Sequence, residues 1–177
     1  MTGKQYDKVM QRFLRVNITP KSRVVDVGCG TGWTALYLSR CKKGCEVEGV
    51  DINEVKVHRA NRLFLKAKRD HLVHCLKGRV EKLDDRFPPH SFDYAVSVHS
   101  LHHFSYPVRA LRAIRRILDR DGVLLLCELT SEYGLKIDNC DRYSSPEISL
   151  LVKEAGFKNI KTSVKKPGVI LIRAKRN

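Results

Sequence analysis

Residues 24–32 read Val24-Val-Asp-Val-Gly-Cys-Gly-Thr-Gly32, in which three closely spaced glycines follow a β-branched run. The run from Arg23 to Val27 predicts a buried strand, and Trp33–Cys41 predicts a helix. Glycines between a strand and a helix let the backbone turn sharply and let a ligand approach its amides closely. The segment therefore predicts a ligand site where the first strand leads into the first helix.

Strands and helices alternate along the rest of the chain. We expect further strands at residues 46–50, 72–76, 92–98, 123–129, 158–164 and 169–174, and helices at residues 4–16, 53–68, 108–118 and 144–156. Such alternation is typical of a parallel sheet covered by helices, with ligands at the carboxyl ends of the strands. The tight Pro167-Gly168 connection predicts that the last two strands form an antiparallel hairpin. The expected architecture is an open α/β sandwich.

Length and composition favour one domain over residues 1–177, with residues 1–20 as a short helical N-terminal extension. No apolar run is long enough to span a membrane, and the N-terminus lacks the apolar stretch of a signal peptide. The six cysteines follow no disulfide-framework spacing, so we expect reduced thiols and a cytoplasmic location. A membrane protein, a secreted protein and a fibre are excluded as leading interpretations.

The glycine spacing and one acidic residue separate two classes of nucleotide site. A dinucleotide fingerprint requires G-x-G-x-x-G, whereas Gly28, Gly30 and Gly32 give G-x-G-x-G, followed by the bulky Trp33. Trp33 would obstruct the close packing of helix on strand, which disfavours NAD. Asp51 ends the second strand, where a carboxylate can accept two hydrogen bonds from a ribose diol, although it could instead cap the next helix. Together these features favour an adenosine-ribose site.

Five segments carry a resemblance to a known family. They are Val24–Gly32, Asp51 after Val50, Ser91–Phe104, Leu111–Leu126 and Ala155–Phe157. These segments resemble the Rossmann-like (class I) S-adenosylmethionine-dependent methyltransferases, and the resemblance covers about residues 20 to 177. It implies a seven-stranded, mostly parallel sheet of order 3-2-1-4-5-7-6 with an antiparallel last strand. It also implies an enzyme that uses S-adenosylmethionine and releases S-adenosylhomocysteine.

The same resemblance implies which residues hold the cofactor. Asp26 and the glycine turn would lie under the methionine moiety, Asp51 would hold the ribose hydroxyls, and Ile52 would pack on the adenine. Val98 and His99 would lie beside the sulfonium. The full set of expected cofactor residues is Asp26, Gly28, Cys29, Gly30, Gly32, Asp51, Ile52, Arg79, Val80, Val98 and His99.

One segment departs from the family pattern. Many relatives have an aspartate after the third strand that contacts the adenine amino group, whereas Lys77-Gly-Arg-Val-Glu81 places Arg79 at that position. An arginine cannot accept the hydrogen bond of an amino group. A backbone carbonyl or the carboxylate of Glu81 would have to replace this contact.

Candidate catalytic residues follow the fourth and fifth strands. Methyl transfer from a sulfonium depends mainly on orientation and exclusion of water, and a base is needed only if the acceptor must lose a proton early. His99, His102 and His103 lie at the expected mouth of the site, and Glu128 ends the fifth strand. The favoured alternative is that the adjacent histidines cap a loop through their hydrogen bonds.

Cysteines and histidines in the first half of the chain have no metal-binding pattern. Cys41 and Cys45 are four residues apart, and His71, His74 and Cys75 cluster further along without a C-x-x-C pair. Buried thiols and surface histidines are the favoured interpretation, and no metal site is expected.

The methyl acceptor stays open at this stage. Lys and Arg total 34 against 19 acidic residues, and the net charge of +15 suits RNA, an acidic substrate or simply a solvated surface. The short segment ahead of the first strand leaves little chain for a lid, which suits an RNA or protein acceptor or a partner subunit. Residues of the loop before the last helix that would contact a substrate are Tyr133, Asp138, Asp141 and Tyr143.

Two further function classes remain open. A non-catalytic relative, acting as a binding or scaffold protein, would bind the cofactor without turnover. A basic RNA-binding protein would lose affinity steeply with salt and would be unaffected by Asp51→Ala. The chain has no recognisable RNA-binding module, and its aromatic content of 7% gives no evident platform for base stacking.

Overall fold

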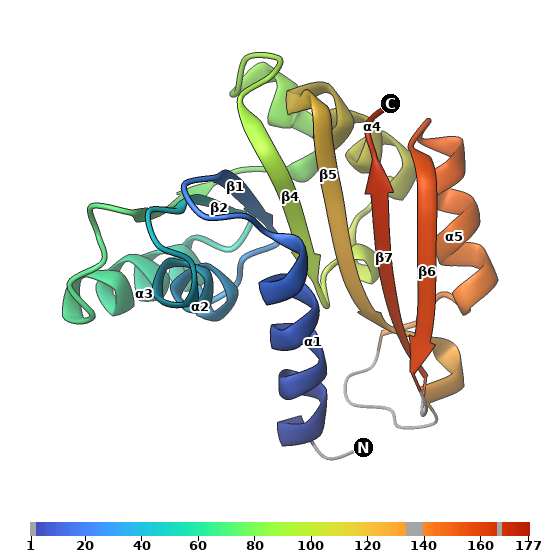
Figure 1. The fold of residues 1–177 in the computed structure, drawn as a ribbon, viewed down its shortest axis with the longest axis horizontal. Helices are drawn as coiled ribbons and strands as arrows, with labels where there is room; N and C mark the ends of the chain where they lie inside the picture. Colours follow the sequence, from blue (N-terminus) through green and yellow to red (C-terminus); the bar gives the residue numbers. More distant parts are fainter. Residues whose placement is uncertain (1–2, 134–139, 166–167) are drawn as a thin grey trace.

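The computed structural model describes residues 3–133, 140–165 and 168–177, and a seven-stranded sheet forms its centre (Figure 1). The strand order is β3-β2-β1-β4-β5-β7-β6. The first five strands pair in parallel, and β7 runs antiparallel to both of its neighbours. The strands are β1 Arg23–Val27, β2 Glu46–Asp51, β3 Val73–Lys77, β4 Phe92–Val98, β5 Leu118–Leu129, β6 Lys158–Lys165 and β7 Val169–Lys175.

Helices cover both faces of the sheet and give three layers (Figure 1). The first three helices share one core with the sheet, and the last two share the other. Within the described part of the chain, no helix combines the length and the apolar character that a membrane span requires. The helices are α1 Gly3–Asn17, α2 Trp33–Cys41, α3 Glu54–Lys66, α4 Pro107–Ile117 and α5 Ser145–Glu154, with short 3₁₀ helices η1 Val80–Asp85, η2 Leu101–His103 and η3 Ser131–Tyr133.

The alternation of side chains along each strand divides the core between the two faces. In β1, Val24 belongs to the core under α1 to α3, and Val25 and Val27 belong to the core under α4 and α5. The apolar run of β5 is buried from residue 122 to residue 129, as a strand covered on both faces requires. The apolar stripe of α4 is buried at Ala110, Leu111, Ala113, Ile114 and Ile117.

The order of the strands fixes the position of the site. From β1 the chain proceeds to β2 and β3 on one side, and β4 and β5 follow on the other side of β1. The direction of progression therefore reverses between β1 and β4. In open α/β sheets, ligands bind outside the carboxyl ends of the strands at such a reversal. The segments that follow Val27, Asp51 and Val98 meet at this edge.

The expected sheet order and the antiparallel last strand are confirmed, whereas the start of β5 and the three short 3₁₀ helices differ from the expectation. Strand β5 begins at Leu118 rather than Val123, because Leu118 pairs with Phe92 ahead of an irregularity in the register. The helices η1, η2 and η3 were not predicted, since segments of three to six residues have no repeated apolar period. Pro167, expected in the final turn, lies outside the described residues.

Candidate active site

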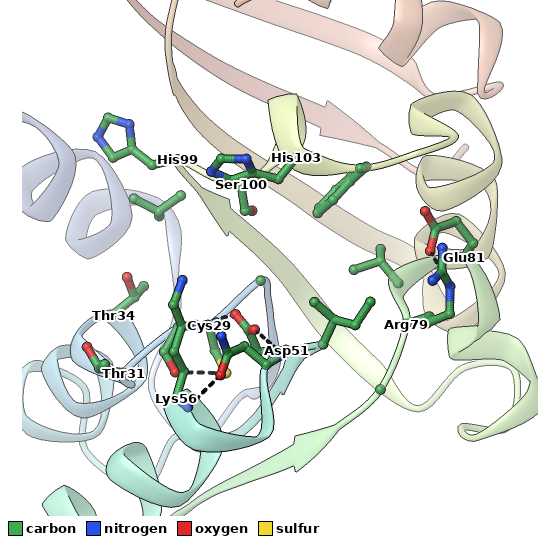
Figure 2. Close-up of a pocket in the computed structure, with 18 of the residues that line it drawn as sticks. Cys29, Thr31, Thr34, Asp51, Lys56, Arg79, Glu81, His99, Ser100 and His103 are labelled. Atoms are coloured by element: carbon green, nitrogen blue, oxygen red, sulfur yellow. Dashed lines mark hydrogen bonds and ion pairs between the residues drawn. The ribbon is translucent and has the colours of Figure 1, made fainter. Parts of the chain in front are cut away.

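A cavity of about 490 Å³ lies at the carboxyl edge of the sheet, where the segments that follow four strands converge. Its wall is formed by the glycine turn after β1, the start of the segment after β2, the residues between β3 and η1, and the segment after β4. Figure 2 shows His99, Ser100 and His103 on one side of the cavity and Asp51 and the glycine turn on the other. A volume in this range is typical of sites for small molecules and cofactors.

Two glycines give the turn after β1 its shape. Gly30 has a φ of +52°, and no atom lies within 4 Å of the position that a Cβ would take, so its backbone borders open space in the cavity wall. Gly32 has a φ of +83°, and a Cβ there would lie 2.5 Å from the ring of Phe64 on α3. Gly30 therefore leaves room for a ligand, whereas Gly32 lets α2 and α3 approach closely.

Trp33 does not obstruct the packing of α2. Its side chain is 70% exposed and lines the cavity, and the close approach at this end of the turn involves Gly32 and Phe64 instead. The steric reason given above for disfavouring NAD is therefore wrong. The indole instead adds apolar surface to the wall of the cavity.

Asp51 is held at the end of β2 by two backbone amides. Its Oδ2 accepts a hydrogen bond from the N–H of Gly30 and its Oδ1 one from the N–H of Asn53, each at 2.8 Å. The cap of α3 is Asn53, whose side chain accepts a hydrogen bond from the N–H of Lys56, so the alternative that Asp51 caps the helix is wrong. Each carboxylate oxygen can accept a further hydrogen bond. Asp51 is therefore a fixed pair of acceptors beside the cavity.

Asp26 is a buried carboxyl group near the end of β1. It is 1% exposed, and within the described residues its Oδ2 has no hydrogen-bond partner. Desolvation raises the pKa of Asp26 to about 7, with a backbone hydrogen bond from Ala35 opposing the shift and the charge of Asp51 adding to it. A buried oxygen that lacks a partner can be satisfied by a cationic group of a ligand.

Cys29 lines the cavity, and its thiol packs against β3 beneath the turn. Its Sγ lies 3.3 Å from the Sγ of Cys75, and both are free thiols. The hydrogen bond to Cys75 and burial raise the pKa of Cys29, so the side chain stays protonated. Cys29 therefore contributes packing beneath the turn.

Arg79 and Glu81 occupy the wall between β3 and η1. The Nε of Arg79 lies 3.6 Å from Oε2 of Glu81, and the arginine side chain is far more exposed than the carboxylate, 46% against 9%. Both residues line the cavity, together with Ile52 and Val80. An enclosed carboxylate is therefore present where the family's usual aspartate is absent.

His99 and Glu128 form a pair across the ends of β4 and β5. His99 has a φ of +51°, which is uncommon for a residue with a side chain, and its Nδ1 lies 3.7 Å from Oε1 of Glu128. Glu128 is 1% exposed and accepts hydrogen bonds from the N–H groups of Leu101 and Leu129 at 3.0 and 3.1 Å. An imidazole therefore borders the cavity with a fixed carboxylate behind it.

The adjacent histidines differ in their surroundings. The side chain of His102 is 2% exposed, and its Nδ1 lies 3.0 Å from Oε1 of Glu128. His103 lines the cavity, and its Nδ1 lies 3.7 Å from the Sγ of Cys140. His102 therefore has an interior position, whereas His99 and His103 border the space where an acceptor would bind.

The structure brings most of the expected cofactor residues to one wall. Asp26 and Gly32 are buried behind this wall, and Asp138 and the side chain of Tyr133 lie outside the described residues. Glu81 was expected only as a replacement for the missing aspartate. Lining residues that sequence reasoning did not name as site residues are Thr31, Trp33, Thr34, Asn53, Lys56, Gly78, Ser100, Phe104 and Ser105. Ser100 follows His99 directly, and its Oγ donates a hydrogen bond to the carbonyl of Val27 at 2.8 Å, which ties the end of β4 to β1.

We expect Glu128→Gln to lower the free energy of unfolding by about 3 kcal/mol at neutral pH. Burial by itself raises the pKa of Glu128, but hydrogen bonds and charges from His102 and His99 outweigh it and lower the pKa to about 2. Because this folded-state pKa lies below the ordinary value, the ionised carboxylate stabilises the fold above about pH 4.5, and this contribution is lost as the pH falls through about 2. Urea unfolding of both proteins across this pH range measures the difference.

An exposed glutamate provides the control for this prediction. Glu46→Gln, at the exposed start of β2, should leave the unfolding free energy unchanged at every pH. An equal loss in the two variants, or a Glu128→Gln protein as stable as wild type at neutral pH, would contradict the role assigned to the buried carboxylate.

Comparison with known proteins assigns the chain to a family. Residues 25–126 match the family described as "Methyltransferase domain". The S-adenosyl-L-methionine-dependent Diels-Alderase iccD of Talaromyces variabilis is 32% identical over 136 residues, which cover 73% of this chain and 44% of the relative. The sterol 24-C-methyltransferase of Candida albicans is 29% identical over 121 residues, which cover 67% of this chain and 31% of the relative. The chain thus spans less than half the length of these relatives.

A solved structure shares the fold. A chain in the complex of the Haloferax volcanii Trm112 methyltransferase activator superposes with a TM-score of 0.76 at 17% identity, covering 97% of this chain and 92% of that chain. The family match extends from β1 into β5 and includes the glycine turn, Asp51 and His99. Because it covers more than half of the sequence and the strands have the expected order, the chain belongs to the class I S-adenosylmethionine-dependent methyltransferases, whose methyl donor is S-adenosylmethionine.

Proposed function

We propose that the protein transfers a methyl group from S-adenosylmethionine to a small-molecule acceptor that binds beside His99 and His103. The observation that carries this proposal is one continuous cavity that runs from Asp51 and the glycine turn to these histidines. When bound, S-adenosylmethionine supplies an electrophilic methyl group on a sulfonium. The name of the Candida albicans relative gives a sterol as its acceptor, and a sterol is a small molecule.

The residues of the cavity fit the parts of this cofactor. Asp26 would balance the positive charge of the methionine moiety, since one of its buried oxygens lacks a partner. Asp51 would accept hydrogen bonds from the ribose diol, and Glu81 would accept those of the adenine amino group in place of the missing aspartate. The open space at Gly30 supports close contact between the backbone and the ligand.

His99 would take the proton from an acceptor that must lose one. Glu128 lies on the Nδ1 side of its ring, so we assign the proton transfer to Nε2. The carboxylate would then stabilise the imidazolium that forms, which is the usual arrangement for a histidine base. An acceptor that has no proton to lose would need only orientation and exclusion of water.

Affinity for S-adenosylhomocysteine is expected to rise with pH through about 7, where Asp26 ionises. From its position behind the cavity wall, the ionised carboxylate would attract the ammonium group of the ligand, and a charge-assisted interaction of this kind stabilises binding by about 1.5–3 kcal/mol. Asp26→Asn should therefore weaken binding about 10- to 100-fold above pH 7 and abolish its pH dependence. Calorimetric titrations one pH unit below and one above the transition measure both effects.

The same variant separates a binding role from a structural one. Because the pKa of Asp26 is raised in the folded protein, the free energy of unfolding decreases as the pH rises from the ordinary aspartate range to about 7. Asp26→Asn should therefore unfold at a higher temperature than wild type above pH 7. Weaker binding together with lower thermal stability, or pH dependence that persists in Asp26→Asn, would contradict the assignment. Asp70→Asn, at an exposed position, is the matched control.

Two arginines of the basic surface interact with other groups of the fold. On α4, Arg116 pairs with Asp84, and Arg112 donates a hydrogen bond to the carbonyl of Glu154, so both serve within the fold. RNA binding would instead need side chains that engage phosphates, and it would show a steep dependence on salt. A gel-shift titration with such a dependence would favour the RNA alternative.

Transfer of labelled methyl groups tests the proposed function. The protein is incubated with methyl-labelled S-adenosylmethionine and with small-molecule, RNA and protein fractions of an extract of the organism that produces it. We expect label in the small-molecule fraction, and none with the Asp51→Ala variant. Label in RNA or protein would contradict the acceptor class. Cofactor binding without transfer to any fraction would favour a non-transferring function, for which the Diels-Alderase relative is a precedent.

A further inference from the structure

We propose that His102, His103 and Cys140 form a zinc-binding site next to the cavity. Their ligand atoms all lie within 4.8 Å of one another, and in residues 3–133, 140–165 and 168–177 no other trio of histidine, cysteine or acidic side chains meets this criterion. This proposal departs from the expectation of no metal site, since Cys140 lies 37 residues beyond His103 and matches no zinc motif with it. The fold brings η2 and the segment before α5 together.

The spacing of two ligand atoms matches tetrahedral zinc coordination. The Nδ1 of His103 and the Sγ of Cys140 are 3.7 Å apart. Zinc–nitrogen bonds of about 2.0–2.1 Å and zinc–sulfur bonds of about 2.3 Å, at the tetrahedral angle, place such atoms about 3.6 Å apart. The other two pairs, which lie within 4.8 Å, need to approach by at most about 1.5 Å. Side-chain rotation within this cluster can supply a movement of that size.

Glu128 provides the outer partner that a zinc-bound histidine normally has. Its Oε1 lies 3.0 Å from Nδ1 of His102, so we assign Nε2 of this ring to the metal. A carboxylate on the far nitrogen fixes the tautomer and the orientation of the ring and makes it a stronger ligand. The same carboxylate is anchored by the N–H groups of Leu101 and Leu129, so the ring has a rigid support.

The ligand set and its burial favour zinc over harder cations. Two imidazoles and one thiolate are ligands for zinc, whereas magnesium and calcium require oxygen atoms. His102 is enclosed, Cys140 is half-buried and His103 borders the cavity. Three protein ligands leave a fourth position for water or a ligand atom. If the proposed function holds, a sulfur or oxygen atom of the acceptor would occupy that position. This role of the metal rests on the proposed function, whereas the binding of the metal does not.

Metal content and spectroscopy test the site without any measure of methyl transfer. Tag-free protein is incubated with zinc, dialysed, and analysed for bound metal, and zinc affinity is measured against a chromophoric chelator. We expect about one zinc per chain, and an affinity about 100-fold lower in Cys140→Ser and in His103→Gln. With cobalt in place of zinc, wild type should show thiolate-to-cobalt charge-transfer absorption that Cys140→Ser lacks.

A matched cysteine variant and a folding check make each outcome decisive. Cys41→Ser removes another half-buried thiol, at the end of α2, and should retain zinc and the cobalt absorption of wild type. Circular dichroism is used to check that the variants are folded, and His103→Gln alters an exposed residue that the core does not need. Equal zinc binding in wild type and Cys140→Ser, or no zinc retained by wild type, would overturn the proposal and leave a thiol–imidazole hydrogen bond.

Discussion

Asp51→Ala is expected to reduce the affinity for S-adenosylhomocysteine about 100-fold or more. The variant removes a charged acceptor from the position where a ribose diol would bind, and each charge-assisted hydrogen bond contributes about 1.5–3 kcal/mol. It also releases the N–H groups of Gly30 and Asn53, which the two carboxylate oxygens hold at 2.8 Å. Both effects act on the ligand side of the glycine turn. Calorimetric titration of wild type and variant measures the loss.

Two control variants define what the Asp51 result means. Asp51→Asn keeps an oxygen for one of the two amides and loses the charge, so its affinity should fall between those of wild type and Asp51→Ala. Asp70→Ala removes an exposed carboxylate of the loop before β3 and should bind like wild type. Binding by Asp51→Ala within a few-fold of wild type would show that the cavity does not hold a ribose at this position.

Gly32→Ala is expected to lower the free energy of unfolding by about 3–5 kcal/mol. Its Cβ would lie 2.5 and 2.8 Å from two ring atoms of Phe64 and 2.9 Å from the Cβ of Ala60. Phe64 is fully buried, so its ring has no space into which it could move. The positive φ of +83° adds the strain of a left-handed conformation. Urea unfolding measures the loss.

Gly30→Ala is the matched control because it makes the same chemical change two residues earlier. Its φ is also positive, at +52°, but nothing lies within 4 Å of the new methyl group. This variant should lose only about 1–2 kcal/mol of stability. Its affinity for S-adenosylhomocysteine should nevertheless fall, since the methyl group would occupy space that borders the ligand. Equal stability losses at the two positions, or unimpaired binding by Gly30→Ala, would contradict these distinct roles.

The parts of the fold that the sequence predicts are those with local signals. The β-branched run of β1 and the apolar run of β5 need no knowledge of distant residues, because a strand covered on both faces is apolar throughout. The positions of Asp51 and His99 follow from strand ends in the same way. Strand order came from the resemblance to a family rather than from any local pattern, and the structure confirms it.

The parts that the sequence could not predict depend on contacts between distant segments. Trp33 is exposed, and the close approach to Phe64 on another helix involves Gly32 instead, so a steric argument from spacing alone was wrong. The proximity of Cys140 to His103 likewise depends on how the segment before α5 passes η2. The raised pKa of Asp26 results from burial, which a strand pattern does not quantify. Such properties emerge only when the chain is packed.

The most direct test of the account is a calorimetric titration of the wild-type protein with S-adenosylhomocysteine and, separately, with NAD. The geometry of Asp51, the open space at Gly30 and the buried carboxyl group of Asp26 predict one S-adenosylhomocysteine site per chain. Membership of the methyltransferase family predicts no comparable binding of NAD. Absence of S-adenosylhomocysteine binding, or NAD binding of equal strength, would contradict the assignment of this cavity to a methyl-donor cofactor.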